Sequence, residues 1–452
     1  MAPSKRISSG YWEPPLAVTL TFLIFVVARY MQWGARRDIL ATIRIEFVLG
    51  LVLTVACAFL LTTAPLNLGR LKAAKQVLIA IALLFFAMII QIPFAADKEL
   101  AQTIFVDRVI KFAMLTFFMV TLIRSPKTSR WFLAAFLFAC FYVTQEAARG
   151  ALSGSLVWEN QGIPRLHGAV PIYRHPNSLA GVAMGIIPFV VFIFPVIERL
   201  WIRLLLLAPL GTACICLLYS GSRTGYLAFI SFLLFWWSQS RRKLRWVLVL
   251  AATALVVTPL LPQQYVDRFN SIGGQEAEGH SKAKRVEILV DAVTILGENP
   301  FGVGVASFPA VRLERFGRDQ DTHNLYLEVA TNLGVQGFVI FILLIACIAR
   351  ALLTARKRLR RQLVSLRKSA SNSGKAQHQQ SAMNKHTSDL LFMEASCTAL
   401  LGYLYVRLAL GMFGMDLYEP YWWFLAGGSI VCATSTLAMH HKTQSIISIH
   451  QE

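Results

Sequence analysis

The chain has 452 residues, of which 56% are hydrophobic and only 15% are charged. A soluble globular chain carries about 25% charged residues, and a disordered chain has few apolar ones, so the composition excludes both classes. The formal net charge of +20 is expected to lie mainly in cytoplasmic loops, which collect Lys and Arg in membrane proteins, rather than to bind nucleic acid. We therefore predict an all-α polytopic membrane protein.

A helix needs roughly 17 to 25 mostly apolar residues to cross the hydrocarbon core, and about twelve such spans are predicted. Lys5 and Arg6 precede the first span and no small-residue cleavage site follows it, so we expect this span to be retained. The spans are expected at residues 16–33, 43–64, 74–95, 107–123, 130–146, 178–197, 203–219, 224–238, 245–262, 324–348, 389–411 and 420–440.

The distribution of positive charge orients these spans. Segment 349–388 has ten Lys or Arg and no acid, whereas loop 263–323 has seven Lys or Arg and nine Asp or Glu. The first is therefore expected in the cytoplasm and the second on the opposite, outer face. The predicted organisation is nine spans within 1–262, an outer loop at 263–323, the tenth span at 324–348, a basic flexible cytoplasmic loop at 349–388, and two spans with a C-terminal tail within 389–452.

Four polar sites are predicted on the outer face, and the first two precede helices. Arg174-His175-Pro176-Asn177 lies before a span, where proline keeps His175 out of the helical region and Asn177 or Ser178 can cap the helix. An Arg-His pair at a helix start could hold an anionic group, although a plain helix entry explains it equally. The second is the Gly/Ser turn 220–225, where Arg223 either binds an anion or extends to lipid phosphate.

The third site lies in the outer loop. Residues 282–297 begin with basic residues, among them Arg285, and carry apolar side chains at 286, 288, 289, 292, 293, 295 and 296. This pattern predicts an amphipathic helix that lies on the membrane or caps a cavity. The turn residues Asn299-Pro300-Phe301-Gly302-Val303-Gly304 end that helix. No GKS or GKT follows, so they do not form a phosphate loop.

The fourth site is His323-Asn324, where the loop re-enters the membrane. The positive end of a helix dipole disfavours imidazolium, so His323 is expected to stay neutral and able to accept a proton from a hydroxyl; the alternative is a simple helix cap. The outer turns lack an acidic pair for a divalent metal, metal-ligand histidine spacing and a GxSxG elbow. Arginines and one histidine suit base catalysis without metal or cofactor.

These motifs, in their order and spacing, resemble those of the O-antigen ligase and O-antigen polymerase superfamily of bacterial envelope glycosyltransferases. The resemblance covers about residues 170–345 by motif and the whole chain by topology. It rests on His175-Pro176-Asn177-Ser178-Leu-Ala180, Ser222-Arg223-Thr224-Gly225, Arg285, the Asn299–Gly304 turn and His323-Asn324-Leu-Tyr326.

The resemblance implies a GT-C-like membrane enzyme of the bacterial inner membrane with its active site on the periplasmic side. Members move a glycan from undecaprenyl pyrophosphate to an acceptor hydroxyl, with inversion and without metal. By position, Arg223 and Arg285 would bind the pyrophosphate and His323 would activate the acceptor, with Arg174, His175, Asn177 and Asn324 as further substrate contacts. The acceptor stays open: lipid A–core, another lipid-linked glycan, or a protein.

A lipid flippase or transporter is the competing class, since such proteins keep ionisable groups near mid-membrane. Arg407 is the clearest mid-span candidate, with Arg29 and Lys111 nearer span ends. Asp416 follows Arg407 by nine residues. That is about 13 Å along a helix, so we expect no direct pairing between the two.

Overall fold

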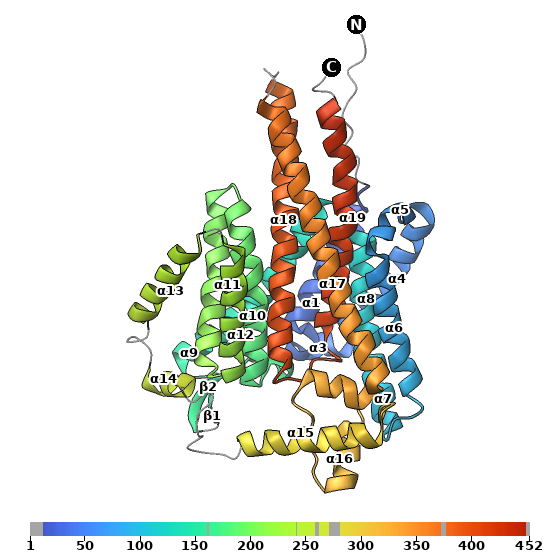
Figure 1. Cartoon of the computed structure of the whole chain (residues 1–452), viewed down its shortest axis with the longest axis vertical. Coiled ribbons are helices and arrows are strands. Elements are labelled where there is room, and N and C mark those ends of the chain that lie inside the picture. Colours follow the sequence, from blue (N-terminus) through green and yellow to red (C-terminus); the bar gives the residue numbers. More distant parts are fainter. Residues whose placement is uncertain are drawn as a thin grey trace.

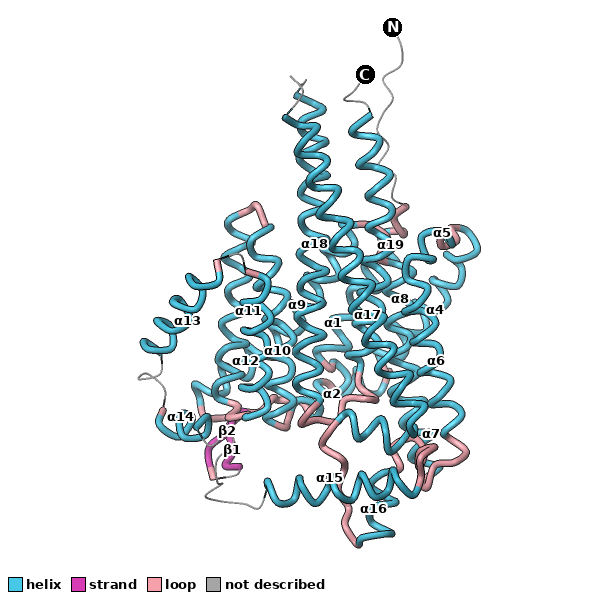
Figure 2. Tube along the Cα trace, viewed as in Figure 1, coloured by secondary structure: helices cyan, strands magenta, loops and turns pink. Residues whose placement is uncertain are grey.

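Helices make up most of the chain in the computed structural model, which describes residues 12–160, 162–240, 242–257, 262–270, 281–371 and 377–448 (Figures 1 and 2). A short antiparallel hairpin, β1 (Val157–Asn160) and β2 (Ile163–Leu166), pairs Val157 with Leu166. The helices of the described residues are α1 (Leu16–Met31), α2 (Trp33–Arg36), α3 (Asp38–Thr42), α4 (Ile45–Thr63), α5 (Leu68–Leu71), α6 (Lys75–Gln91), α7 (Lys98–Ile104), α8 (Lys111–Leu122), α9 (Pro126–Ser153), α10 (Pro176–Ile193), α11 (Leu200–Tyr219), α12 (Arg223–Gln239), α13 (Lys243–Val257), α14 (Gln263–Asn270), α15 (Ser281–Glu298), α16 (Phe308–Phe316), α17 (Leu325–Ser371), α18 (Gln377–Gly411) and α19 (Pro420–Ser448).

Each of the twelve predicted spans overlaps one of these helices, and residues 258–261 of the ninth predicted span lie outside the described residues. In the described part of the chain, eight segments are long and apolar enough to cross a membrane; they contain α4, α6, α9, α10, α11, α17, α18 and α19. Helices α1, α8, α12 and α13 are shorter, at 16, 12, 17 and 15 residues. The structure is therefore an all-α polytopic membrane protein, as predicted.

Burial separates a central group of helices from a peripheral one. Helices α10, α18 and α19 bury most of their surface, whereas α4 and α11 leave most of theirs outside the protein core. The outward side chains are large and apolar, for example Phe47, Val55 and Phe59 on α4 and Leu205 on α11. Exposed apolar helices suit a lipid environment, because each helix satisfies its own backbone hydrogen bonds.

The basic segment 349–388 is not the flexible loop that its composition predicts. Residues 349–371 continue α17 as helix and residues 377–388 begin α18, while 372–376 fall outside the described residues. Buried Leu352, Leu359, Leu363 and Leu366 form a helical stripe within the basic run. This stripe packs α17 against α18 and α19, and the three helices extend beyond the other spans as a stalk (Figure 1).

The stalk and the outer loop lie at opposite ends of the molecule. Helix α15 runs across the far end from the stalk, with α16, the hairpin and α7 beside it (Figures 1 and 2). At the stalk end, Trp12 stacks on Arg124 and Glu13 contacts Lys127. The start of α1 and the end of α19 therefore share one end of the molecule. We call the end that holds α15 the outer end.

Candidate functional site

Helix α17 is interrupted at the outer end of the molecule. Gly334 has φ 72° and ψ −178°, so the helical hydrogen-bond ladder is interrupted there. The Asn299–Gly304 turn fills the break: the amides of Val303 and Gly304 donate to the carbonyls of Thr331 (2.9 Å) and Asn332 (3.0 Å). A Cβ on Gly302 would lie 2.5 Å from the amide nitrogen of Gly334, so only glycine fits. This turn therefore locks the outer loop onto α17.

His323 lies just before α17 in a strained conformation. Its φ is 47°, the left-handed region that is uncommon for residues with a side chain and that is often found at functional sites. It does not cap the helix, because the side-chain oxygen of Asn324 accepts the amides of Tyr326 (3.0 Å) and Leu327 (3.1 Å). The capping alternative for His323 is therefore wrong, and its exposed imidazole is available for another role.

The surroundings of His323 favour the neutral imidazole. Partial burial lowers its pKa from the ordinary value of 6.5; Asp321 opposes that shift, and the guanidinium groups of Arg285 and Arg312 add to it. The direction agrees with the expectation from the helix terminus, although the main cause is desolvation. His323 is therefore mostly unprotonated at pH 7 and able to accept a proton.

A second cluster gathers around Asn177 at the start of α10. The cap of α10 is His175, with φ −78° and ψ 131°, and its Nδ1 accepts the amide of Asn177 (3.1 Å). The prediction that proline keeps His175 extended is confirmed, but capping by Asn177 or Ser178 is wrong. The Oδ1 of Asn177 instead accepts hydrogen bonds from Arg165 Nη2 (3.0 Å) and Ser222 Oγ (2.9 Å).

The turn that carries Arg223 is held by the same cluster. Ser222 caps α12 by accepting the amide of Gly225 (3.1 Å), which makes Arg223 the first residue of the helix. The Nε of Arg165, a fully buried residue of β2, donates to the carbonyl of Ser220 (2.8 Å). Gly221 has φ 56° and lies against Ile163. The hairpin therefore fixes the position of Arg223 at a helix N-terminus, where anions are favoured.

Electrostatics links the two clusters. The pKa of His175 is lowered by partial burial, by the guanidinium of Arg165 and by His323. His323 in turn responds to Arg285. Hydrogen bonds thus bring His175, Asn177 and the turn that carries Arg223 together through Ser222, while His323 and Arg285 influence one another electrostatically.

Arg285 comes from α15, the amphipathic helix predicted over 282–297. One apolar stripe of α15, Ile288, Ala292 and Ile295, packs on Val303 and Phe308. A second stripe, Val286, Leu289 and Val293, stays exposed. The guanidinium of Arg285 lies 5.8 Å from the ring centroid of Phe413, and Asn324 Nδ2 donates to the neighbouring Met412 carbonyl (3.1 Å). The loop after α18 therefore borders both Arg285 and Asn324.

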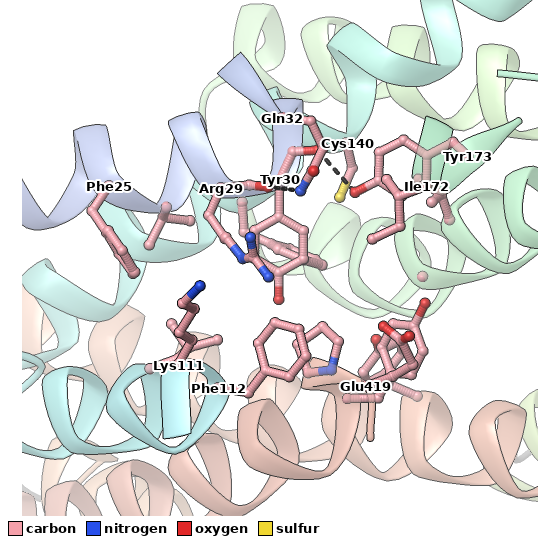
Figure 3. Close-up of a pocket in the computed structure, with 18 of the residues that line it drawn as sticks. Phe25, Arg29, Tyr30, Gln32, Lys111, Phe112, Cys140, Ile172, Tyr173 and Glu419 are labelled. Atoms are coloured by element: carbon pink, nitrogen blue, oxygen red, sulfur yellow. Dashed lines mark hydrogen bonds between the residues drawn. The ribbon is translucent and has the colours of Figure 1, made fainter. Parts of the chain in front are cut away.

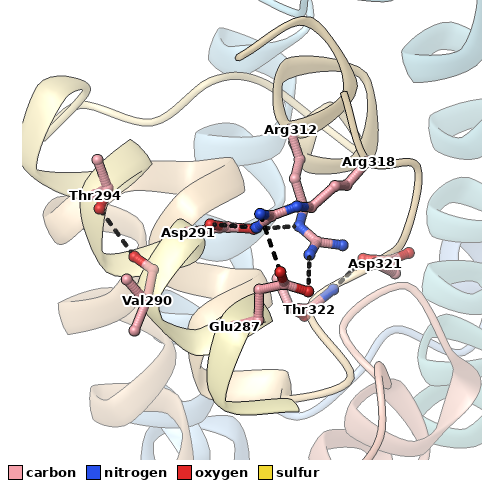
Figure 4. Close-up of polar contacts among 8 residues, drawn as sticks. All are labelled: Glu287, Val290, Asp291, Thr294, Arg312, Arg318, Asp321 and Thr322. Carbon is pink, nitrogen blue, oxygen red and sulfur yellow. Dashed lines mark hydrogen bonds and ion pairs between the residues drawn. The ribbon is translucent and has the colours of Figure 1, made fainter. Parts of the chain in front are cut away.

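A buried ionic network fixes α15 to the segment before His323 (Figure 4). Asp291 of α15 accepts Arg312 Nε at 2.9 Å and Arg318 Nη1 at 3.1 Å, and Glu287 accepts Arg318 Nη2 at 3.0 Å. Arg312 and Asp291 are both buried. Since removing one partner of such a pair leaves a buried charge without its counter-charge, this network holds α15 in register with residues 312–318.

Arg174 is the predicted site residue with the least support. Its side chain is exposed and, within the part of the chain that the structure describes, makes no hydrogen bond or ion pair, although its backbone amide donates to the Pro171 carbonyl (3.2 Å). Arg165, Asp291 and Arg312 were not identified from the sequence. Each is a charged residue in an outer segment, but their contacts join positions 12 to 55 residues apart, and no local pattern reveals such pairs.

Arg407 and Asp416 do approach each other, contrary to the expectation from helix length. Arg407 Nη1 lies 3.8 Å from Asp416 Oδ2. Helix α18 ends at Gly411, and the following loop folds Asp416 back along the helix end. Arg407 also donates to the Gly181 carbonyl (2.9 Å) and stacks on Tyr421. These contacts give this buried arginine a packing role between α10, α18 and α19.

Comparison with known families identifies the region that holds the central site residues. Residues 208–342 match the family model Wzy_C, described as O-antigen ligase. The matched region runs from α11 into α17 and includes Arg223, Arg285, His323 and Asn324. A search of curated proteins gives no match to the chain. Residues 208–342 are therefore similar to the O-antigen ligase family, which confirms the resemblance predicted from the motifs.

Proposed function

We propose that the protein is an O-antigen ligase-like glycosyltransferase. It moves a glycan from undecaprenyl pyrophosphate to an acceptor hydroxyl, with inversion at the anomeric centre. A single observation carries this proposal. His323, whose lowered pKa favours the neutral imidazole, lies at the same end of the bundle as Arg285 and the turn that holds Arg223. The matching family model adds support from the sequence.

His323 is the proposed base. Its lowered pKa keeps the imidazole unprotonated at neutral pH, and its strained backbone holds the ring outside the helix cap. A positioned base of this kind accelerates proton transfer by about 10²- to 10⁴-fold. His323 takes the proton from the acceptor hydroxyl as the oxygen attacks the anomeric carbon, while Asn324, Asn177 and His175 contact the substrates.

Arg223 and Arg285 are the proposed partners of the pyrophosphate. The leaving group carries two or more negative charges, and the planar guanidinium offers paired hydrogen bonds to phosphate oxygens. Arg223 also lies at the N-terminus of α12, whose dipole favours an anion. Arg174, exposed beside His175, is a further contact for the donor.

Arginines take the place of a divalent metal in this proposal, so transfer proceeds without metal or cofactor. The test uses purified protein in proteoliposomes with radiolabelled lipid-linked glycan and an acceptor. Transfer that persists in EDTA supports the proposal. Activity abolished by EDTA and restored by magnesium contradicts it, and lipid translocation without transfer points to a flippase instead.

Lipid A–core is the proposed acceptor, and the site faces the periplasm at the bacterial inner membrane. Polymerases and protein O-oligosaccharyltransferases of the same superfamily act on another lipid-linked glycan or a protein. The glycan profile of a deletion strain separates them. Unligated lipid-linked polymer supports the ligase, single repeats on core support the polymerase, and loss of glycan from a protein supports the third activity.

A further inference from the structure

A cavity at the outer end lies apart from the site described above (Figure 3). It is enclosed by α1, α8, α9, α10, α18 and α19, and none of His175, Asn177, Arg223, Arg285 and His323 lines it. Its volume is about 50 Å³. Since one water needs about 10 to 15 Å³ on this scale, the cavity accepts a few waters or one small polar group, but not a sugar.

Three cations line this cavity; Arg407 pairs with Asp416, and Arg29 and Lys111 point into the cavity from two other helices. Figure 3 shows the Arg29 guanidinium, from the last turn of α1, and the Lys111 ammonium, from the first turn of α8, converging on the same space. Arg29 stacks on Phe112 at 4.9 Å. Within the described chain, no carboxylate lies within 4.0 Å of its guanidinium, and its nitrogens donate no hydrogen bond. Its donors therefore face the cavity.

The cavity keeps a net positive charge, because the acidic residues near it do not neutralise its cations. Lys111 pairs with Asp107 at 2.5 Å, but both side chains are well exposed and such i,i+4 pairs are weak. Glu419, the one acid that lines the cavity, pairs with Arg108 at 3.0 Å. Burial raises the pKa of Glu419 to about 7, despite opposing effects of Arg108, Arg29 and Arg407. Its negative charge is therefore reduced at neutral pH.

The walls below the cations are apolar. Phe25, Val26 and Leu115 line the cavity on the side that continues into the membrane-spanning parts of α1 and α8. Paired cations at the end of two spans, above apolar side chains, match the layout of a phospholipid, whose phosphate lies at the interface and whose acyl chains extend into the hydrocarbon.

We propose that Arg29 and Lys111 bind the headgroup phosphate of a membrane phospholipid, at a site separate from the glycosyl-transfer site. The small volume admits the phosphate, and Arg29 supplies a planar fork for its oxygens. The acyl chains lie outside, along α1 and α8. This inference does not depend on the proposed transfer reaction.

The test measures lipid binding to the full-length protein in neutral detergent by native mass spectrometry. The probe is dioleoylphosphatidylglycerol, compared with dioleoylglycerol, which has the same tails without phosphate. The Arg29→Gln/Lys111→Gln variant is expected to lose about tenfold or more in affinity for the phospholipid, because two charged hydrogen-bond donors are removed. Dioleoylglycerol should bind neither protein at this site.

Two further variants serve as controls. Arg44→Gln/Lys98→Gln removes the same charge from the same end of the molecule outside the cavity, and should bind like the wild type. Ile172→Trp keeps every charge but fills the exposed mouth of the cavity, and should reproduce the loss. Thermal unfolding checks that each variant is folded.

Equal binding by the Arg29→Gln/Lys111→Gln variant and its charge-matched control overturns the proposal, as does full binding by Ile172→Trp. In a last experiment, inorganic phosphate competes with the phospholipid for binding to the wild-type protein. If it displaces the phospholipid at equal concentration, the cavity is a free-phosphate site and the lipid assignment is wrong. If it does not, the tails contribute to binding as proposed.

Discussion

The two ends of the molecule use basic residues in different ways. At the stalk end, the long helices α17, α18 and α19 carry Lys and Arg residues. Many of these side chains, such as Lys357 and Arg361, are exposed. At the outer end, Arg165 is buried in strand β2 of the hairpin and Arg312 is buried in the short helix α16. Basic residues therefore lie exposed on regular helices at one end, whereas at the other end they are buried close to turns, a hairpin and a broken helix.

The outer end also carries the backbone strain that the stalk lacks among its described residues. His323 and Ala306 have the positive φ that residues with a side chain rarely adopt, and both lie in the segment that leads from α15 to α17. Strain of this kind persists only where surrounding contacts fix it. We therefore expect large functional effects of substitutions at the outer end and small ones on the stalk.

His323→Ala should give the largest effect. Transfer should fall by about 10²- to 10⁴-fold, the usual contribution of a positioned base. Expression and donor binding should stay near the wild type, since the imidazole is exposed and caps no helix. Single-turnover transfer in proteoliposomes, alongside donor binding, measures both. A variant that keeps most of its activity would remove His323 from the mechanism.

Arg223→Lys should have the next largest effect. Lysine keeps the charge but loses the planar fork, and a lost charged hydrogen bond at a desolvated site lowers transfer by about tenfold to a hundredfold. Complementation of a deletion strain and the KM for the donor measure the loss. If Arg223 only reaches lipid phosphate, the lysine variant will complement as well as the wild type.

Asp291→Asn tests whether the ionic network positions Arg285. Removing the carboxylate strands buried Arg312, which destabilises α15 and shifts Arg285 relative to His323. Transfer should fall about tenfold through a higher donor KM. The double variant Asp291→Asn/Arg312→Met should recover part of the loss, because no charge is left unpaired. A fall in kcat alone, with no recovery, argues against a positioning role.

Lys357→Gln/Arg361→Gln on the stalk should have the smallest effect, with transfer within about twofold of the wild type, the range expected of exposed substitutions. Matched assays on this variant and on Arg223→Lys make the comparison between the two ends directly. A loss on the stalk as large as that at Arg223 contradicts the division of roles.

The sequence predicted the helical membrane fold well because span length and hydropathy are local properties. All twelve expected spans are helices, and the amphipathic helix at 282–297 is α15. The flexible loop at 349–388 was predicted wrongly, since the buried leucines of α17 were hidden in a run of basic residues. These leucines stabilise the helix only when α18 and α19 pack against them, and the sequence alone does not show that packing.

The candidate site was predicted in part. His175, Asn177, Arg223, Arg285 and His323 were identified from motifs, and their grouping could be expected from topology. Three features could not: the Arg165 contacts, the Asp291 network and the folding of Asp416 back to Arg407. Each depends on long-range packing or on the path of a loop, and residue spacing carries no information about either.

The pH dependence of transfer by the wild type and His323→Gln tests the central claim most directly. The pKa of His323 is lowered from 6.5, so the neutral imidazole dominates at pH 7 and the wild-type rate should fall only below about pH 6.5, as the ring is protonated. Glutamine can orient the acceptor but cannot take its proton. His323→Gln should therefore be slow by about 10²-fold or more, with no decline on the acid side. Near-normal transfer by His323→Gln, with the wild-type pH profile, would show that His323 only orients the acceptor.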